Sequence, residues 1–462
     1  MIQNRFLQTR VGIFNALIYL PYGVLLPFLA LWFGNYGWNW AQISIILGMS
    51  MTVSIFFDPI VGAIADRTQA FRLLTFILAT LSIISWLLLP LFNDNFYWIL
   101  LCYTLFRLFW VAIIPIIDNL GLAITKDLNG NWGILRSSGS IAFIITAQLT
   151  GFLITGREDW ADLMYQLVSA FMVVLVAGTV ILPRYQIAKE NLQTFSRVKL
   201  LLHPSIALFA LGVFLIAKSH GQELYFGSVR WSGVGFSPSR ISDLWTMRVG
   251  AEVIAFITFG YVLRTQDSLK AFRNLCIIFA GSFLIYLGLS QFNISYKFFN
   301  LFTLSDIANI LFTLTYGSAL VGVTVLLLYS VRKETRPADL VIIGAFASII
   351  RWAVLASTSQ EQLIFVAESL HALTYGAFMI GSLTWVRSTL PQNLSTTAVG
   401  LFNGALMLGF SVGAYLAGIM WQHFEEKSWY FESGIAALGL VSLLLAFSLY
   451  AKDKQNLTAQ FH

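Results

Sequence analysis

Pairs of opposite charge lie inside long apolar runs of this sequence, at spacings that suit a helix. Arg248 and Glu252 are four residues apart, and Glu368 and His371 are three apart. Residues at these spacings share one face of a helix, so each pair can meet. A carboxylate in an apolar environment takes up a proton when a neighbouring cation changes its partner. These residue types therefore suit proton exchange and the binding of an organic anion.

Single cations occur in the apolar runs as well, at Arg107, Lys218 and Arg351. An ionisable side chain at the bilayer centre costs about 2.5–3.5 kcal/mol on insertion scales, so we expect these groups to face a cavity or an acidic partner. The alternative is a static buried ion pair that fixes helix packing. For Lys218, a side chain that extends to the membrane surface is a further alternative.

The apolar runs that carry these residues indicate a membrane protein. Hydrophobic residues make up 58% of the chain and charged residues 11%, whereas about a quarter of the residues of a soluble domain are charged. Runs of about 18–25 residues can cross a hydrocarbon core of ~30 Å as helices. We predict such spans at 11–33, 41–63, 73–91, 97–118, 134–155, 164–183, 204–227, 240–263, 272–291, 305–330, 339–357, 361–386, 396–420 and 429–450.

The positive charges support this topology. With a cytoplasmic N-terminus, 19 of the 28 Lys and Arg residues fall in or beside cytoplasmic loops and termini, and five face outside. This is the bias that the positive-inside rule requires. The sequence thus predicts an all-α polytopic membrane protein of about 14 transmembrane helices with both termini cytoplasmic. The net charge of +6 then reflects loops beside anionic lipids, not a nucleic-acid partner.

A repeated motif divides the chain into halves. The segment "GAIADRTQAFR" (62–72) follows the second span, and "GYVLRTQDSLKAFR" (260–273) follows the second span of the other half. Transporters built from parallel repeats bind substrate between their halves. The first copy resembles the signature loop between helices 2 and 3 of the major facilitator superfamily, with Gly62, Asp66, Arg67 and Arg72 at its main positions.

A closer resemblance is to the phenylpropionate permease family, which is related to lactose and nucleoside proton symporters. It rests on "YGVLLPFLALW" (22–32), "PIID" (115–118), "GILRSSGS" (133–140), "AEV" (251–253), "RW" (351–352) and "LH" (370–371). The resemblance to the charged residues of lactose permease implies proton coupling by Glu252, Glu368 and His371, although the order of the last pair is reversed here. Arg351 is the candidate to hold a carboxylate substrate, because a guanidinium binds a carboxylate in a bidentate manner.

Further site residues are predicted from their place on the expected helices. Arg248 and Lys218 are predicted to line the substrate cavity, and Tyr22 and Phe28 to contact an aromatic substrate. Charges at the cytoplasmic ends of helices 2, 4 and 5 are predicted to form a gate; these are Asp66, Arg67, Arg72, Asp118 and Arg136. A solvated cluster of helix-end charges is the alternative.

The expected organisation is a major facilitator fold with an addition. It comprises an N-terminal six-helix bundle (1–183), a central cytoplasmic loop (184–203), a C-terminal bundle (204–450) and a cytoplasmic tail (451–462). The C-terminal bundle includes an extra helical hairpin at about 270–335, where the resembled family has a short loop. Which helix pair is the inserted one stays open.

The function expected from these features is secondary active transport. We predict a proton-coupled symporter that imports a small organic acid, such as an aromatic carboxylate, by alternating access. The alternatives are a nucleoside or sugar proton symporter, drug efflux and, in another class, a non-transporting sensor or scaffold. We expect no enzymatic activity, no metal and no cofactor, with the proton gradient as the energy source. The expected partners are a small molecule, protons and membrane lipids, in a bacterial inner membrane, as a monomer or as a dimer through the hairpin.

Overall fold

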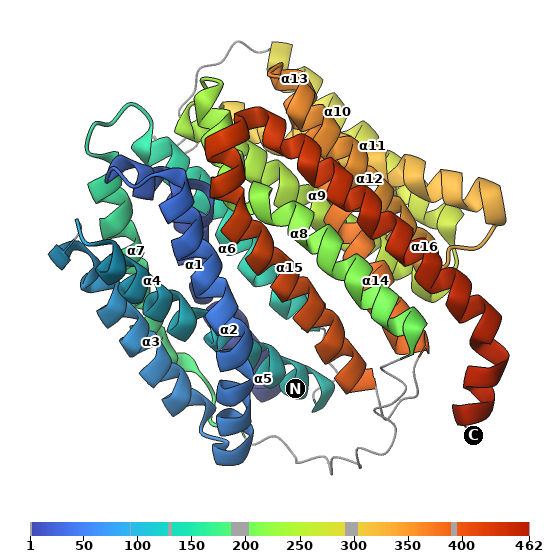
Figure 1. Ribbon diagram of the computed structural model, residues 1–462, viewed down its shortest axis with the longest axis horizontal. Coiled ribbons are helices and arrows are strands. Elements are labelled where there is room, and N and C mark those ends of the chain that lie inside the picture. Colours follow the sequence, from blue (N-terminus) through green and yellow to red (C-terminus); the bar gives the residue numbers. More distant parts are fainter. Residues whose placement is uncertain are drawn as a thin grey trace. The chain divides into compact units, whose positions relative to one another are not determined.

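The computed structural model describes residues 2–92, 94–127, 132–185, 203–291, 304–389 and 395–461. Within these residues the regular structure is helical, without a strand (Figure 1). Each of the predicted spans coincides with a helix or with two or three consecutive helical segments. Most of the central loop predicted at 184–203 falls outside the described residues, so that prediction stays a prediction.

Two units emerge from the contacts within the chain. Unit 1 consists of Met1–Leu192, Gln222–Ser242 and Ser411–His423. Its N-terminal part contains α1 (Ile2–Asn35), α2 (Trp40–Thr68), α3 (Phe71–Leu87), α4 (Phe96–Val111), α5 (Ile113–Asp127), α6 (Trp132–Ile154) and α7 (Trp160–Gly178).

Unit 2 consists of Gln193–Gly221, Asp243–Phe410 and Phe424–His462. Its helices, some of which extend into unit 1, are α8 (Pro204–Gly233), α9 (Pro238–Thr265), α10 (Ser268–Gln291), α11 (Leu304–Arg332), α12 (Pro337–Ser357), α13 (Glu361–Ser369), α14 (Phe378–Thr389), α15 (Ser395–Phe424) and α16 (Ser428–Phe461).

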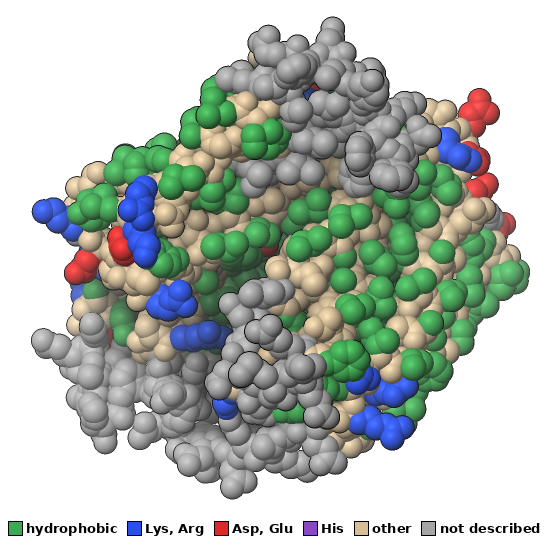
Figure 2. Space-filling model, turned by 180° about the vertical axis from the view of Figure 1, so that it is seen from behind, with side chains coloured by type: hydrophobic (Ala, Val, Ile, Leu, Met, Phe, Trp, Pro, Cys, Tyr) green, Lys and Arg blue, Asp and Glu red, His purple; other side chains and the backbone are tan. Residues whose placement is uncertain are grey.

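The helices have the length and composition of membrane spans. Twelve helical stretches of the described chain are long and apolar enough to cross a membrane, and one of them, Ala398–Asp453, contains both α15 and α16. The described part of α11 contributes a shorter apolar helix, Thr315–Val331. Figure 2 shows many hydrophobic side chains on the visible face, and charged side chains in a few small groups. The fold is that of an all-α polytopic membrane protein.

Small residues set how closely helices approach in unit 1. Gly23 on α1 faces α6, where an added Cβ would lie 2.7 Å from both the Phe143 carbonyl oxygen and the Thr146 Cβ. Glycine at such a position lets two backbones come together, which stabilises helix pairs through van der Waals contact in lipid. This contact holds α1 against α6, and α1 carries Tyr22.

The hairpin predicted at about 270–335 corresponds to α10 and α11. Its buried residues form one hydrophobic core with α9, α12 and the segment before α14; these include Ala271, Leu275, Val321 and Val325, packed with Ala251, Ala255 and Ala372. Other apolar residues of the hairpin are exposed, among them Ile277, Leu284 and Leu327. The hairpin therefore packs against α9 and α12, the helices that carry Glu252 and Arg351.

Candidate functional site

The intramembrane charges of unit 2 come together from α9, α12 and the end of α13. After Ser369 the helix is interrupted by a π-helical segment, Ala372–Ala377, before α14 begins. Such segments are rare and frequently occur at functional sites. Gly376 in this segment approaches α9 so closely that an added Cβ would lie 2.7 Å from the Ala255 Cβ. This close approach brings Glu252 on α9 beside His371.

Glu368 lies between two arginines. Arg351 Nη2 donates a hydrogen bond of 2.5 Å to Glu368 Oε2, and Arg248 Nε lies 3.5 Å from the same oxygen. The side chains of Arg351 and Glu368 have no accessible surface. Arg248 also lies over the ring of Trp245, 4.1 Å from its centroid, a favourable cation–π geometry. Glu368 is thus the shared counter-ion of two buried cations.

The hydrogen bond from Arg351 fixes the tautomer of His371. Arg351 Nη1 lies 2.9 Å from His371 Nδ1 and donates, since a guanidinium has no acceptor. His371 Nδ1 must then be the unprotonated nitrogen. The proton is on Nε2, which lies 3.3 Å from Glu252 Oε2. A neutral His371 therefore joins Arg351 to Glu252.

Glu252 is the accessible carboxylate of the site. Its side chain is 21% exposed, whereas that of Glu368 is fully buried. With both glutamates ionised and His371 neutral, the two arginines and two glutamates carry no net charge. Uptake of one proton leaves the cluster with a single positive charge, which a monovalent anion can balance. The arrangement can therefore couple a proton to an anion.

Lys218 has a partner that the sequence analysis missed. Its Nζ donates hydrogen bonds of 2.7 and 2.9 Å to the two carboxylate oxygens of Glu432 on α16. Both residues are buried, which contradicts the alternative of a Lys218 side chain that extends to the membrane surface. A lone glutamate in the last apolar run was the signal that could have identified this partner.

The predicted gate residues lie in unit 1, and some of them meet. Arg136 Nε lies 3.6 Å from Asp118 Oδ1, and its guanidinium lies over Tyr19 at 4.8 Å. Asp66 accepts a hydrogen bond of 3.5 Å from Asn119, the neighbour of Asp118. Arg67 is exposed on the last turn of α2, and Arg72 is half-buried in the first turn of α3. Their gating role stays a prediction.

The two aromatic residues predicted to contact substrate have different surroundings. Tyr22 packs against Trp110 of α4 with the ring centroids 4.1 Å apart. Phe28 is buried and borders a cleft that also includes Leu31, Trp38, Trp160 and Phe236. Tyr22 thus lies close to the half-buried Arg107 of α4, whereas Phe28 lies about two turns further toward the C-terminal end of α1.

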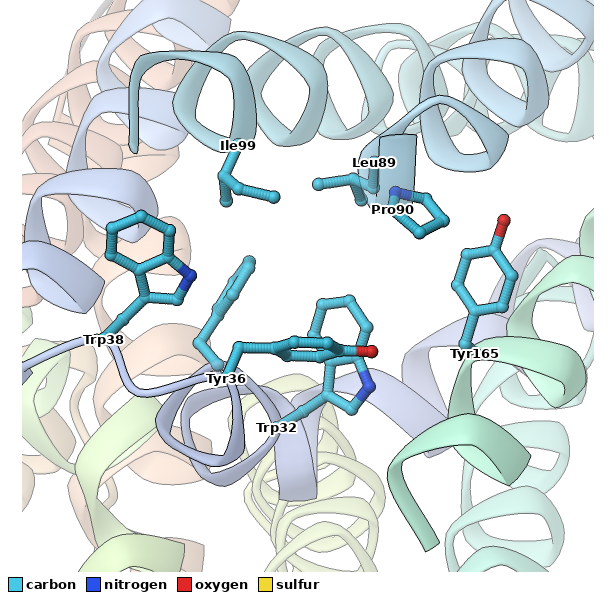
Figure 3. Close-up of a pocket in the computed structure, with 8 residues that line it drawn as sticks. Trp32, Tyr36, Trp38, Leu89, Pro90, Ile99 and Tyr165 are labelled. Atoms are coloured by element: carbon cyan, nitrogen blue, oxygen red, sulfur yellow. The ribbon is translucent and has the colours of Figure 1, made fainter. Parts of the chain in front are cut away.

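A separate aromatic pocket lies at the same end of unit 1. Figure 3 shows Trp32, Tyr36, Trp38 and Tyr165 around a shared space closed by Leu89, Pro90 and Ile99. Its lining contains no charged side chain. This composition suits the packing of helix ends near a membrane interface, where Trp and Tyr are enriched.

In the part of the chain that is described, no group of three or more His, Cys, Asp and Glu side chains has the arrangement of a metal site.

Comparison with known proteins agrees with this architecture. The model of the MFS_1 like family matches residues 9–268 and 264–432. A probable 3-phenylpropionic acid transporter of Escherichia coli (strain K12) is 26% identical over 257 residues, which cover 53% of this chain and 65% of that protein. The aligned part thus spans just under two thirds of that relative. The uncharacterized transporter YwbF of Bacillus subtilis (strain 168) is 20% identical over 96% of this chain and 94% of its own.

Solved structures show the same fold. The nucleoside transporter NupG superposes with a TM-score of 0.69 at 14% identity and covers 96% of this chain and 99% of its own. With the family model matching most of the chain in both halves, the protein belongs to the MFS_1 like family and is a membrane transporter of the major facilitator type.

Proposed function

We propose that this protein is a proton-coupled symporter that imports a small organic acid by alternating access. The observation that carries the proposal is the chain of contacts from Glu252 through His371 and Arg351 to Glu368. A scaffold would gain stability from apolar residues in place of such a buried cluster. The name of the Escherichia coli relative supports an aromatic acid as the first substrate to test.

Glu252 is the proton acceptor in this proposal. It is the more accessible of the two glutamates, and its Oε2 lies 3.3 Å from His371 Nε2. Protonation of His371 itself would break its bond to Arg351, because Nδ1 would become a donor. In the present arrangement Arg351 has no accessible surface. A substrate anion reaches it only after Glu368 or His371 moves.

Coupling one proton to one monoanion moves no net charge across the membrane. A membrane potential, worth ~2.3 kcal/mol per charge per 100 mV, then contributes nothing to accumulation. A gradient of one pH unit supplies about 1.4 kcal/mol, or about tenfold accumulation. Proteoliposomes should therefore accumulate substrate in response to a pH gradient and not to a potassium diffusion potential. Potential-driven uptake without a pH gradient would exclude this stoichiometry.

The experiment uses labelled organic acids, including 3-phenylpropionate, with a nucleoside and a sugar as alternative substrates. Glu252→Gln should abolish accumulation driven by the pH gradient while exchange of internal for external substrate continues, since the amide cannot release a proton. Glu334→Gln, an exposed glutamate between α11 and α12, is the matched control and should accumulate substrate normally. Normal accumulation by Glu252→Gln would remove this residue from the proton path.

A further inference from the structure

Arg107 is a membrane-embedded cation with part of its hydrogen-bonding capacity unused. It lies on α4 near the middle of a long span. Its two hydrogen bonds both come from Nη1, at 3.1 Å to the Ser50 carbonyl oxygen and 3.0 Å to Ser54 Oγ on α2. Within the described parts of the chain, no carboxylate forms an ion pair with it. The N–H groups of Nε and Nη2 have no protein acceptor there.

This unused edge has a defined chemical preference. Nε–H and Nη2–H point in nearly the same direction and match the two oxygens of a carboxylate, which they bind in a bidentate manner. The Arg107 side chain is half-buried, so a ligand can reach it. Arg351 differs from Arg107 in both respects, because the Arg351 side chain is fully buried and already bound to Glu368.

Aromatic side chains surround Arg107. The phenol groups of Tyr22, Tyr103 and Tyr225 lie close enough to interact with it electrostatically. Tyr22 packs against Trp110, one turn along α4 from Arg107, with 4.1 Å between ring centroids. Tyr225 also donates a hydrogen bond to Met51 Sδ at 3.6 Å. Tyr103, Trp110 and Tyr225 are buried, whereas Tyr22 is partly exposed, so a flat apolar group attached to a bound carboxylate would meet the ring of Tyr22.

Asp58 is a carboxyl group close to this site. It follows Ser54 by one helical turn on α2 and interacts with Arg107 at longer range. Its Oδ1 atom is buried and has no hydrogen-bond partner. A second carboxylate at Arg107 would be repelled by a charged Asp58, so this residue opposes anion binding.

We propose that the Nε and Nη2 edge of Arg107 binds the carboxylate of the transported acid, and that the partly exposed ring of Tyr22 contacts its aromatic ring. The proposal rests on the proposed function, since it takes the substrate to be an organic acid. It assigns substrate recognition to Arg107 on α4 of unit 1. The cluster around Arg351 in unit 2 then serves proton exchange. The substrate class is an aromatic monocarboxylate with a short linker.

The test is equilibrium binding of phenylacetate, 3-phenylpropionate and cinnamate to the purified full-length protein. Losing a hydrogen-bonded charged partner costs enough that Arg107→Gln should weaken binding about 10–100-fold. Arg107→Lys should weaken it less, because the ammonium keeps the charge but not the bidentate geometry. Asp58→Asn should strengthen binding. Arg264→Gln, an exposed arginine near the end of α9, is the control and should bind as the wild type does.

A neutral analogue separates recognition from misfolding. 3-Phenylpropionamide should bind weakly to the wild type and equally weakly to Arg107→Gln, since it carries no charge for the arginine to recognise. Unchanged acid binding by Arg107→Gln would overturn the proposal. A loss of acid binding in Asp58→Asn as large as that in Arg107→Gln would also overturn it, because it would show that Arg107 and Asp58 act together as a structural pair.

The outcomes also separate this proposal from the proposed function. Wild-type protein that binds none of the aromatic acids overturns the Arg107 site, even if another organic acid accumulates with protons. Binding that depends on Arg107 without accumulation under a pH gradient supports the site and overturns proton-coupled import.

Discussion

Lys218 and Glu432 bring opposite charges together inside the membrane-spanning part of unit 2, with both side chains buried. Removing one member of such a pair leaves an uncompensated charge, which costs about 3–5 kcal/mol. We expect Lys218→Met or Glu432→Gln to lower the thermal unfolding midpoint strongly. The double variant Lys218→Met/Glu432→Leu should recover most of the loss, because apolar residues can replace a buried pair.

Transport by the double variant then decides the role of Lys218. If the pair is structural, the stable double variant accumulates substrate as the wild type does. If Lys218 holds substrate, as the sequence analysis predicted, transport is lost although stability returns. Additive destabilisation in the double variant would contradict the existence of a coupled pair.

Residue spacing identifies neighbours on one helix but not partners on another. The spacing of Glu368 and His371 correctly indicated a shared face. It could not indicate that Arg248 lies 3.5 Å from Glu368 on a different helix, or that Lys218 pairs with Glu432. Those contacts depend on helix packing, which is set by small residues such as Gly376. The identities of the charged residues were therefore predictable, and their partners were not.

The packing of α1 against α6 depends on Gly23, and α1 itself supplies a matched control. In Gly23→Ala the new methyl group would meet atoms of α6 at 2.7 Å, and overpacking of this kind costs about 1–3 kcal/mol. Gly12 on the same helix has no neighbour within 4 Å of an added Cβ. Gly12→Ala should leave stability unchanged or raise it by up to ~1 kcal/mol, through the higher helix propensity of alanine.

Thermal unfolding in detergent, followed by tryptophan fluorescence, measures both variants. Equal midpoints for Gly23→Ala and Gly12→Ala would show that the close approach of α1 and α6 does not limit stability. Helix existence itself followed from apolar length, which is why every predicted span coincides with helical structure. The π-helical segment had no such signal, since nothing in the composition of Ala372–Ala377 distinguishes it from an ordinary helix.

The orientation of the whole molecule in the membrane is the remaining prediction from charge distribution. In a background with Cys102 and Cys276 replaced, Lys427→Cys should react with an impermeant thiol reagent in intact cells, and Glu334→Cys should not. Both positions are exposed, so accessibility to the reagent depends on the side of the membrane. Permeabilised cells provide the control, in which both should react. Labelling of Glu334→Cys in intact cells would show that the predicted orientation or the predicted number of fourteen spans is wrong.

The π-helical segment between α13 and α14 also affects how the chain tolerates changes in length. An α-helix turns by 100° per residue, so deleting one residue from it rotates everything beyond the deletion. A π-helical turn already contains one residue more than an α-helical turn would hold. Loss of a residue within Ala372–Ala377 can therefore be absorbed by conversion to α-helix, with Glu368 and α14 keeping their directions. The same deletion within α12 would turn Arg351 away from its partners.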